Sequence, residues 1–444
     1  MRTSSQGILY LVAAVGLIGP LSSQLAAQGV TSSAVTGTVT RAGGGPVESA
    51  NVVLINTTNG IRVATQTRGN GRFNLENVAP GGPYTIEVRA IGFELASRTG
   101  VLLNLGQRYT ADFEMTPRVV TLAELAVVAV TNPLINNGRT GPASTITDTA
   151  IQALPLLGRN FTSLLNTNPQ VIPGRSGGAS IAGQNNRFNS IQVDGGVNND
   201  VFGLPASGTP GGQAGAKPLS LEALKEFQVL VAPFDIRYGG FSGGLVNAVT
   251  KSGTNRFSGS VFGYLQRPSL VGADTAGNEV ADFDINQYGF TVGGPIVRDK
   301  AHFFVAGDFQ SQSTPFFGFE AGEPATGISV AAAEAVQNRL RTAYGFDPGG
   351  ILSPVLGRPD NNVFAKLNWQ VASKHMLELS NNYVKSSDDN FSRGTRDRNN
   401  RDGWMLSNSG YAFTNKTNST RFKLTSTFGL ASNELLVAYQ TVRD

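Results

Sequence analysis

The sequence predicts a mainly β protein with three folded parts in a row. They are a β-sandwich, a small α/β domain, and the first strands of an antiparallel transmembrane β-barrel. Three observations predict this fold class. Short alternating strands separated by Gly, Pro and Asn turns open the chain, and a glycine-rich α/β stretch follows. Longer strands then alternate apolar and polar residues, as a strand between lipid and an aqueous lumen requires.

Composition restricts the class of protein. The 444 residues include 54 glycines, no cysteine and only 15% charged residues. Beyond the N-terminus, no apolar run approaches the ~20 residues that a membrane-spanning helix needs. The mean hydropathy of the chain is near zero, which barrel strands also give because their apolar and polar residues alternate. The net charge of +4 is too small to indicate nucleic-acid binding. Without cysteine, disulfide and thiol chemistry are excluded.

Residues 1–27 are predicted to be a secretory signal peptide. Arg2 supplies the positive charge, Ile8–Ile18 is the apolar core, and Leu25-Ala-Ala27 is the expected cleavage site. The apolar core is too short for a stable membrane span. We therefore expect an exported protein.

Residues 28–118 are expected to form a β-sandwich of short strands. Turn residues such as Asn59-Gly60 and Pro80–Pro83 separate the strands. The pattern T-R-G-N-G-R-F at Thr67–Phe73, followed by P-Y-x-I-x-V at Pro83–Val88, resembles the carboxypeptidase regulatory-like domain. The resemblance implies a non-catalytic sandwich, and the zinc-ligand spacing of a peptidase is absent. The expected strands are Val35–Thr40, Ala50–Ile55, Val63–Thr67, Arg72–Leu75, Tyr84–Arg89 and Tyr109–Met115.

Residues 146–254 are expected to form the α/β domain. A strand at Asn189–Asp194 is followed by a short capped helix that begins at Ser220. Two further strands are expected at Phe227–Val231 and Leu245–Thr250. The glycines of Tyr238–Gly244 allow positive φ and a close approach between backbones.

Three motifs of this domain resemble the plug domain of TonB-dependent outer-membrane receptors of the Oar-like type. They are N-x-I-x-V-D-G, L-x-x-L-K-E-F-x-V and Y-G-G-x-x-G-G-x-V-N-x-V-T-K-S-G. The alternative is a glycine-rich soluble α/β domain with no role in transport. Arg187 and Asp194 flank one strand and would either pair inside the domain or face a solute. The candidate plug-motif residues are Arg187, Asn189, Asp194, Gly195, Glu226, Tyr238, Gly239, Gly244, Asn247, Thr250 and Lys251.

Residues 119–145 are expected to link the sandwich to the plug. The β-prone run Leu122–Thr131, followed by Asn132-Pro133, resembles the TonB box of this family. The resemblance implies that the box adds as an extra strand to the energy-transducing protein in the periplasm. The alternative is a final sandwich strand followed by a linker. The candidate box residues are Val127, Val128, Ala129, Val130 and Thr131.

Residues 255–444 are expected to be the N-terminal part of an outer-membrane barrel. Short connections such as Val297–Lys300 and Ala372–Lys374 alternate with long polar connections at 267–284, 313–361 and 386–418, as tight periplasmic turns and large outer loops do. Plugged barrels have about 22 strands, so a truncated barrel is expected. Seven strands are predicted: Arg256–Gln266, Ile285–Pro295, Ala301–Gln312, Asn362–Val371, Met376–Lys385, Ser419–Phe428 and Glu434–Val442.

The resemblance implies a receptor in the bacterial outer membrane that captures a scarce solute and imports it with energy transduced from the inner membrane. The expected partners are a TonB-type energy-transducing protein, outer-membrane lipid, and an unknown small solute, carbohydrate or peptide. No enzyme activity, cofactor or metal is expected, since His302 and His375 are the only histidines. We expect the acidic residues Asp388 and Asp389 to lie in a solvated loop. A non-transporting adhesin or assembly protein and a carbohydrate-binding surface protein stay open as alternatives.

Overall fold

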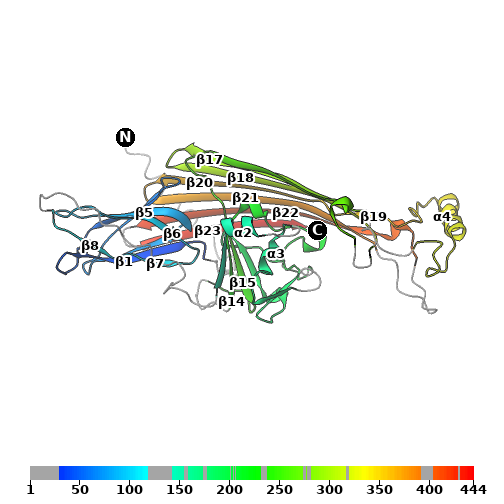
Figure 1. Ribbon diagram of the computed structural model, residues 1–444, viewed down its shortest axis with the longest axis horizontal. Coiled ribbons are helices and arrows are strands. Elements are labelled where there is room, and N and C mark those ends of the chain that lie inside the picture. The colour runs from blue at the N-terminus through cyan, green and yellow to red at the C-terminus, as the bar shows by residue number, and fades with distance from the viewer. Residues whose placement is uncertain are drawn as a thin grey trace, which may run out of the picture.

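The computed structural model describes residues 30–118, 143–154, 159–173, 178–231 (without 201, 204 and 206), 238–273, 277, 282–316, 320–391, 404–428 and 431–444. The expected signal peptide and the candidate TonB box lie outside these residues. No helix in the described part is both long and apolar enough to cross a membrane. Figure 1 shows a long curved sheet with the sandwich at one end, the α/β domain against its middle, and helix α4 at the other end.

The sandwich consists of two four-stranded sheets, with orders β4-β1-β7 (β8 also pairs with β1) and β3-β2-β5-β6. Alternate side chains of both sheets are buried in one core, as in the pattern of β2, where Val52 and Leu54 face inward. The strands are β1 (Ser33–Arg41), β2 (Asn51–Asn56), β3 (Arg62–Gln66), β4 (Arg72–Val78), β5 (Gly81–Arg89), β6 (Ala96–Leu103), β7 (Arg108–Thr110) and β8 (Phe113–Met115).

Two details of the sandwich differ from the prediction. Strand β6 was not expected, because only Val101 and Leu103 of its eight residues are buried and its alternation is weak. The single strand expected at Tyr109–Met115 is divided into β7 and β8. Asp112, which lies between them, accepts hydrogen bonds from the backbone and hydroxyl of Thr38 at 2.8 and 2.7 Å. The side chain thereby takes the place of a backbone partner at the break.

We call the α/β domain, residues 143–254, the plug. Its five-stranded sheet has the order β13-β12-β15-β14-β9, in which β12 and β15 are parallel and β9 is an edge strand. Its elements are β9 (Ala143–Thr147), α2 (Asp148–Ala153), α3 (Phe161–Leu165), β10 (Val171–Pro173), β11 (Ala179–Ile181), η1 (Asn186–Phe188), β12 (Ser190–Val193), β13 (Gly196–Val197), η2 (Gly212–Ala214), η3 (Leu221–Ala223), β14 (Leu224–Val231) and β15 (Gly244–Thr250).

The plug shows two local corrections. The capped helix expected at Ser220 is a single 3-10 turn, η3, and the Ser220 hydroxyl accepts a hydrogen bond from the backbone of Glu222 at 3.3 Å. Strand β14 begins directly after this turn at Leu224, three positions before the expected Phe227, so there is no room for an α-helix. Strand β9 begins at Ala143, inside the segment expected to be a linker.

The long sheet is antiparallel, and its strands follow sequence order from β16 to β23. All seven predicted strands are present, and short β19 additionally pairs with the end of β18. The sheet is open, because β16 and β23 are its two edges. The strands are β16 (Ser258–Gln266), β17 (Asp284–Val297), β18 (Ala301–Pro315), β19 (Val355–Gly357), β20 (Asp360–Ala372), β21 (His375–Asn390), β22 (Tyr411–Phe428) and β23 (Ala431–Arg443).

The connections at the end far from the sandwich hold the remaining helices. They are η4 (Pro268–Leu270), α4 (Val330–Tyr344) and η5 (Ser407–Ser409). The expectation that Asp388 and Asp389 lie in a loop is wrong, because β21 extends to Asn390 and pairs with β22 along its whole length. Asp388 forms an ion pair with Arg358 at 2.8 Å, and Asp389 accepts a hydrogen bond from the Gly357 backbone at 2.9 Å.

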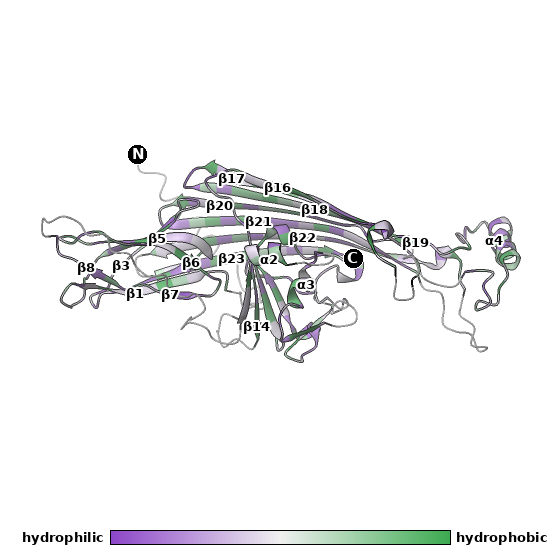
Figure 2. Cartoon of the chain, in the orientation of Figure 1, coloured by the Kyte–Doolittle hydropathy of each residue, from purple (hydrophilic) through white to green (hydrophobic). Residues whose placement is uncertain are grey.

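Hydrophilic and hydrophobic residues alternate along the strands of the long sheet, which Figure 2 shows as bands of colour, and this alternation gives the two faces different polarity. In β20, Trp369 is 46% exposed on the outer face, whereas Lys366 and Asn368 are buried on the inner face. The plug packs against that inner face: Phe304 of β18 and Phe364 of β20 belong to the same apolar core as the plug residue Phe227. Within the described part of the chain, the plug therefore covers the inner face, and apolar side chains of the outer face such as Trp369 are exposed.

Candidate functional site: the junction of sandwich, plug and barrel sheet

The centre of the candidate site is the turn between β12 and β13. Asp194 and Gly195 both have positive φ, 46° and 79°, as the favoured two-residue hairpin turn requires. The turn aims the Asp194 carboxylate at the end of β15. One oxygen accepts a hydrogen bond from the Thr250 backbone at 2.9 Å, and the other accepts one from the Thr250 hydroxyl at 2.6 Å. Two plug motifs far apart in the sequence are thus joined.

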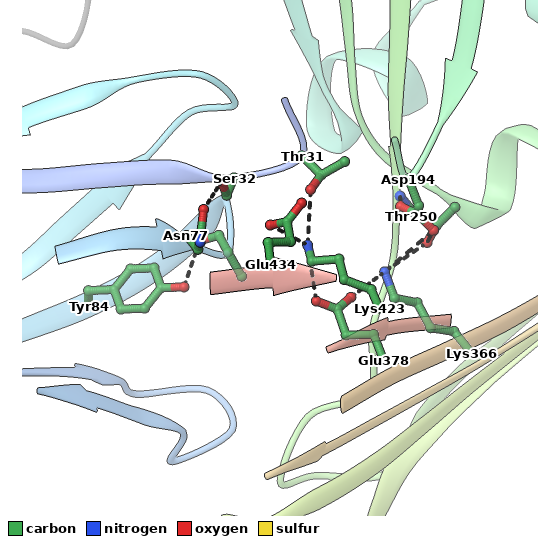
Figure 3. Close-up of polar contacts among 11 residues, drawn as sticks. Thr31, Ser32, Asn77, Tyr84, Asp194, Thr250, Lys366, Glu378, Lys423 and Glu434 are labelled. Carbon is green, nitrogen blue, oxygen red and sulfur yellow. Dashed lines mark hydrogen bonds and ion pairs between the residues drawn. The ribbon is translucent and has the colours of Figure 1, made fainter. Parts of the chain in front are cut away.

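From Asp194 a chain of alternating charges crosses into the barrel sheet (Figure 3). The Lys366 ammonium lies 3.5 Å from Asp194 and 3.3 Å from Glu378, and it donates a hydrogen bond to the Thr250 hydroxyl at 3.1 Å. The Lys423 ammonium lies 3.4 Å from Glu378 and 3.8 Å from Glu434. Each charge therefore has an opposite charge beside it, as buried ionic groups require. We call these five residues, Asp194, Lys366, Glu378, Lys423 and Glu434, the ion chain.

The ion chain follows the strand order of the sheet. Lys366, Glu378, Lys423 and Glu434 lie on the consecutive strands β20, β21, β22 and β23. Glu378 and Lys423 are directly opposite each other in the register of β21 and β22. Opposite charges at such cross-strand positions stabilise a sheet, so these four residues can stay paired within the barrel sheet itself.

The sandwich reaches the ion chain through the segment just before β1. Lys423 donates a hydrogen bond to the Thr31 hydroxyl at 2.9 Å, and Asn247 of β15 donates one to the Val30 carbonyl at 2.6 Å. Residues 30–33 are all buried. The first described residues of the chain therefore lie between the plug and the barrel sheet, and all three parts of the protein meet there.

A second contact joins the sandwich to the plug near the edge strand β9. The backbone N–H of Leu105 donates a hydrogen bond to Glu226 at 2.9 Å, and Gln228 donates one to the Leu105 carbonyl at 3.4 Å. Burial raises the pKa of the Glu226 carboxyl to about 7, although the Leu105 N–H opposes this shift. The protonation state of this contact therefore changes near neutral pH.

The sandwich also covers the end of the long sheet where the short connections lie. Asn255, just before β16, donates its backbone N–H to the Thr58 carbonyl at 2.9 Å. Gln370 donates to the Arg62 carbonyl at 3.1 Å, next to the turn between β20 and β21, and Asn77 donates to Ser432, at the start of β23, at 2.9 Å. The sandwich is thus docked against the short-turn end at several points.

A third polar contact holds the plug closer to the other end of the sheet. Ser220 donates a hydrogen bond to Asp308 of β18 at 3.0 Å, and Asn382 of β21 donates one to the Pro218 carbonyl at 2.9 Å. Lys217 is buried beside them, and its ammonium has no hydrogen-bond partner among the described residues. Burial lowers the pKa of Lys217, although Asp308 and Asp360 oppose this shift.

The other plug-motif residues form the frame of the domain. Asn189 accepts a hydrogen bond from the Gly244 backbone at 3.0 Å, and Lys251 donates its backbone N–H to Ala223 at 2.8 Å. Gly244 leaves no space for a side chain, because a Cβ there would lie 2.3 Å from Ile181. Tyr238 and Gly239 precede β15.

The position of Arg187 decides between the two roles that the sequence left open for Arg187 and Asp194. Arg187 lies in η1 and is exposed, and no ion pair joins it to Asp194, so the first of its two expected roles is excluded. Asp194 instead pairs with Lys366 of the barrel sheet. The alternation of the predicted strand Asn362–Val371 puts Lys366 on its polar face, but nothing in the sequence identified Glu378, Lys423 or Glu434. Their only signal in the sequence is a charge at an inward position of a barrel strand.

Two domain families match this chain. Residues 34–116 match the carboxypeptidase regulatory-like domain, and residues 249–422 match an outer membrane β-barrel domain. The TonB-dependent transporter Oar of Myxococcus xanthus is 29% identical over 264 residues, which cover 54% of this chain and 23% of Oar. The chain is a homologue of this TonB-dependent transporter. Its place is therefore the bacterial outer membrane, and the long sheet of this receptor is part of an outer-membrane barrel.

A second curated protein and several solved structures are also similar to this chain. A probable TonB-dependent siderophore receptor, PirA of Acinetobacter baumannii, is 29% identical over 119 residues, which cover 27% of the receptor chain and 14% of PirA. The receptor chain thus spans less than a quarter of the length of either curated relative. Among solved structures, the outer membrane transporter YddB of Escherichia coli has a TM-score of 0.48 and 15% identity over 67% of this chain and 38% of YddB. The PirA structure from A. baumannii has a TM-score of 0.45 and 19% identity over 68% of this chain and 40% of PirA.

Proposed function

We propose that this receptor captures a small solute at the cell surface and imports it when a TonB-type protein pulls on the candidate box at Val127–Thr131. The observation that carries the proposal is the position of β9. This strand follows the candidate box in the sequence, lies at the edge of the plug sheet and, among the described strands, pairs with β14 alone. A pull on the linker would therefore reach the strand that is held on one side alone.

The expected order of events follows from the contacts. Strand β9 separates from β14 first, because it is an edge strand. Removing an edge strand breaks one ladder of hydrogen bonds, whereas removing a central strand breaks two. Leu105 of the sandwich contacts β14 beside this ladder, through Glu226 and Gln228. The pull would therefore loosen the sandwich and the plug together, before the ion chain separates.

The ion chain is built so that it can separate at one link. When the plug moves away, Lys366 keeps Glu378 as its partner in the barrel sheet. Asp194 keeps the Thr250 backbone and hydroxyl as its partners in the plug. Removal of one partner from a buried ion pair normally costs about 3–5 kcal/mol, because a charge stays buried without compensation. Here both groups keep partners, so the cost of release is smaller and re-docking is possible.

The solute class is proposed from the named relatives. PirA is named a probable siderophore receptor, so a ferric chelate is the first solute to test. Oar and PirA are named as a transporter and a receptor, and we assign this chain no catalytic reaction and no cofactor. Surface capture would involve the long connections that hold α4 and η5, at the end opposite to the sandwich.

The test is direct binding of a TonB periplasmic domain to the full-length receptor. Val128→Pro and Val130→Pro should each abolish this binding, because proline removes a backbone donor and disrupts strand addition. Asn137→Pro, in the same linker but outside the candidate box, is the matched control and should bind normally. Binding that survives both box variants would place the box elsewhere. A receptor that reaches the cell surface but binds no TonB domain would favour the non-transporting adhesin or assembly protein.

A further inference from the structure

A cavity of about 170 Å³ lies where the sandwich, the plug and the barrel sheet meet. All three parts contribute to its wall: Arg62 and Glu76 come from the sandwich, Lys225 from the plug, and Lys374 and Arg421 from the barrel sheet. The cavity lies at the short-turn end, away from the long connections that would face the medium. A ligand held there would contact three parts of the chain at once.

The acidic residues of the cavity wall are already paired. Glu76 forms an ion pair with Arg108 at 2.9 Å. Asp194 is paired with Lys366, and Glu378 lies between Lys366 and Lys423 within the ion chain. These carboxylates therefore have little capacity left to neutralise further cations.

Four cationic residues of the wall are not paired. Within the part of the chain that the structure describes, no carboxylate lies within ion-pair distance of Arg62, Lys225, Lys374 or Arg421, and the charge of Asp194 acts on Arg421 only from a longer range. The wall thus carries an excess of positive charge that comes from all three parts. Clefts lined by one sign of charge attract ligands of the opposite sign, and their low-dielectric walls strengthen this effect.

Two of these cations are fixed in place by close packing. Lys225 lies against the sandwich backbone, since a Cβ at Gly81 would be 2.7 Å from its ammonium nitrogen. Arg421 is 5% exposed and lies against the plug backbone, since a Cβ at Gly196 would be 2.6 Å from its Nε. Nε and Nη1 of Arg421 have no hydrogen-bond partner among the described residues. A buried guanidinium without an acceptor is unfavourable, and a bound anion nearby would offset that cost.

We propose that this cavity binds a small polyanion, a solute with several carboxylate or phosphate groups. Lys225 and Lys374 would contact it directly, and the buried Arg421 would supply positive potential from the wall. Because a bound ligand stabilises the state that binds it, such an anion would hold the sandwich, plug and barrel sheet together. The inference goes beyond transport, since the site would bind its anion whether or not the receptor imports a solute.

The test is isothermal titration calorimetry on the full-length receptor purified in detergent, with citrate and with pyrophosphate as separate probes. The variant Lys225→Ala/Lys374→Ala should bind at least tenfold more weakly than the wild type. Its matched control, Arg339→Ala/Lys416→Ala, removes two cations from α4 and from the far half of β22 and should bind as the wild type does. Binding should also weaken steeply as salt is raised, because salt screens charges that are partly exposed.

The possible results distinguish a carboxylate ligand from a phosphate ligand, and they distinguish anion binding from the proposed transport function. Binding of citrate alone assigns the carboxylate class, and binding of pyrophosphate alone assigns the phosphate class. No binding of either probe to the wild type, or equal weakening in both double variants, overturns the inference. If the double variant does not fold, Lys374→Ala alone serves, because its side chain is exposed in a turn. A receptor that binds the TonB domain but neither anion overturns this inference and leaves the proposed function intact.

Discussion

Lys366 of barrel strand β20 forms an ion pair with Asp194 of the plug, with 3.5 Å between the ammonium nitrogen and the carboxylate oxygen. This is the link of the ion chain at which the plug and the barrel sheet are joined. Lys366 is 6% exposed and Asp194 is 9% exposed, so solvent screens their interaction only weakly. The stability of plug docking should therefore depend on this pair.

Asp194→Asn tests that dependence. The amide keeps an oxygen for the Thr250 backbone but loses the charge beside Lys366. We expect the free energy of unfolding to fall by about 1–3 kcal/mol, the usual cost of weakening a buried charged hydrogen bond. Thermal and denaturant unfolding of the purified receptor measure this. Glu114→Gln, on the exposed face of β8, removes the same charge and should change nothing. Equal stability of wild type and Asp194→Asn would contradict the role of the ion chain.

Glu226→Gln should reduce the pH dependence of stability. Burial raises the pKa of the Glu226 carboxyl from 4.5 to about 7, so the folded receptor binds more protons than the unfolded chain between these values. Stability should therefore fall as the pH rises through this window, by on the order of 3 kcal/mol in total. The substituted amide would keep an oxygen for the Leu105 N–H but would not titrate. Melting temperatures from pH 5 to pH 8 should fall less in the variant, and identical slopes would count against this assignment.

Gly244→Ala should destabilise the plug. The added Cβ would lie 2.3 Å from Cγ2 of Ile181, which is fully buried. Overpacking of this kind costs about 1–3 kcal/mol. Gly263→Ala is a matched control, since a Cβ at that position of β16 meets nothing within 4 Å. Ile181→Ala should partly restore the stability of Gly244→Ala. Additive losses in the double variant would mean that the two side chains do not compete for the same space.

Alternation along the strands was sufficient to predict the seven barrel strands, because each strand has a buried inner face and an exposed outer face. Residues 362–371 show this best, with Trp369 outside and Lys366 inside. The partners of Lys366 were not predictable in the same way. Glu378 and Lys423 come together through the register of β21 and β22, and Asp194 is brought in by a different domain.

The docking of the sandwich against the plug and the barrel sheet could not be predicted from the sequence either. The contacts of Thr31 with Lys423 and of Leu105 with Glu226 join residues more than a hundred positions apart. Neither Thr31 nor Leu105 belongs to a motif, and the contacts depend on how three parts of the chain pack against one another. Strand β6 was missed for a local reason, since only two of its side chains are buried.

Single-cysteine labelling in living cells shows whether a TonB-type protein releases the plug from the barrel sheet. The chain has no cysteine of its own, and Ala248 of β15 is fully buried in the apolar core that the plug shares with the barrel sheet. In the full-length receptor, Ala248→Cys should react with a maleimide in energised cells that contain TonB. It should stay unlabelled after a protonophore is added or when Val128→Pro is also present. Labelling that is absent in energised cells, or that is the same without TonB, would mean that TonB does not separate the plug from the barrel sheet.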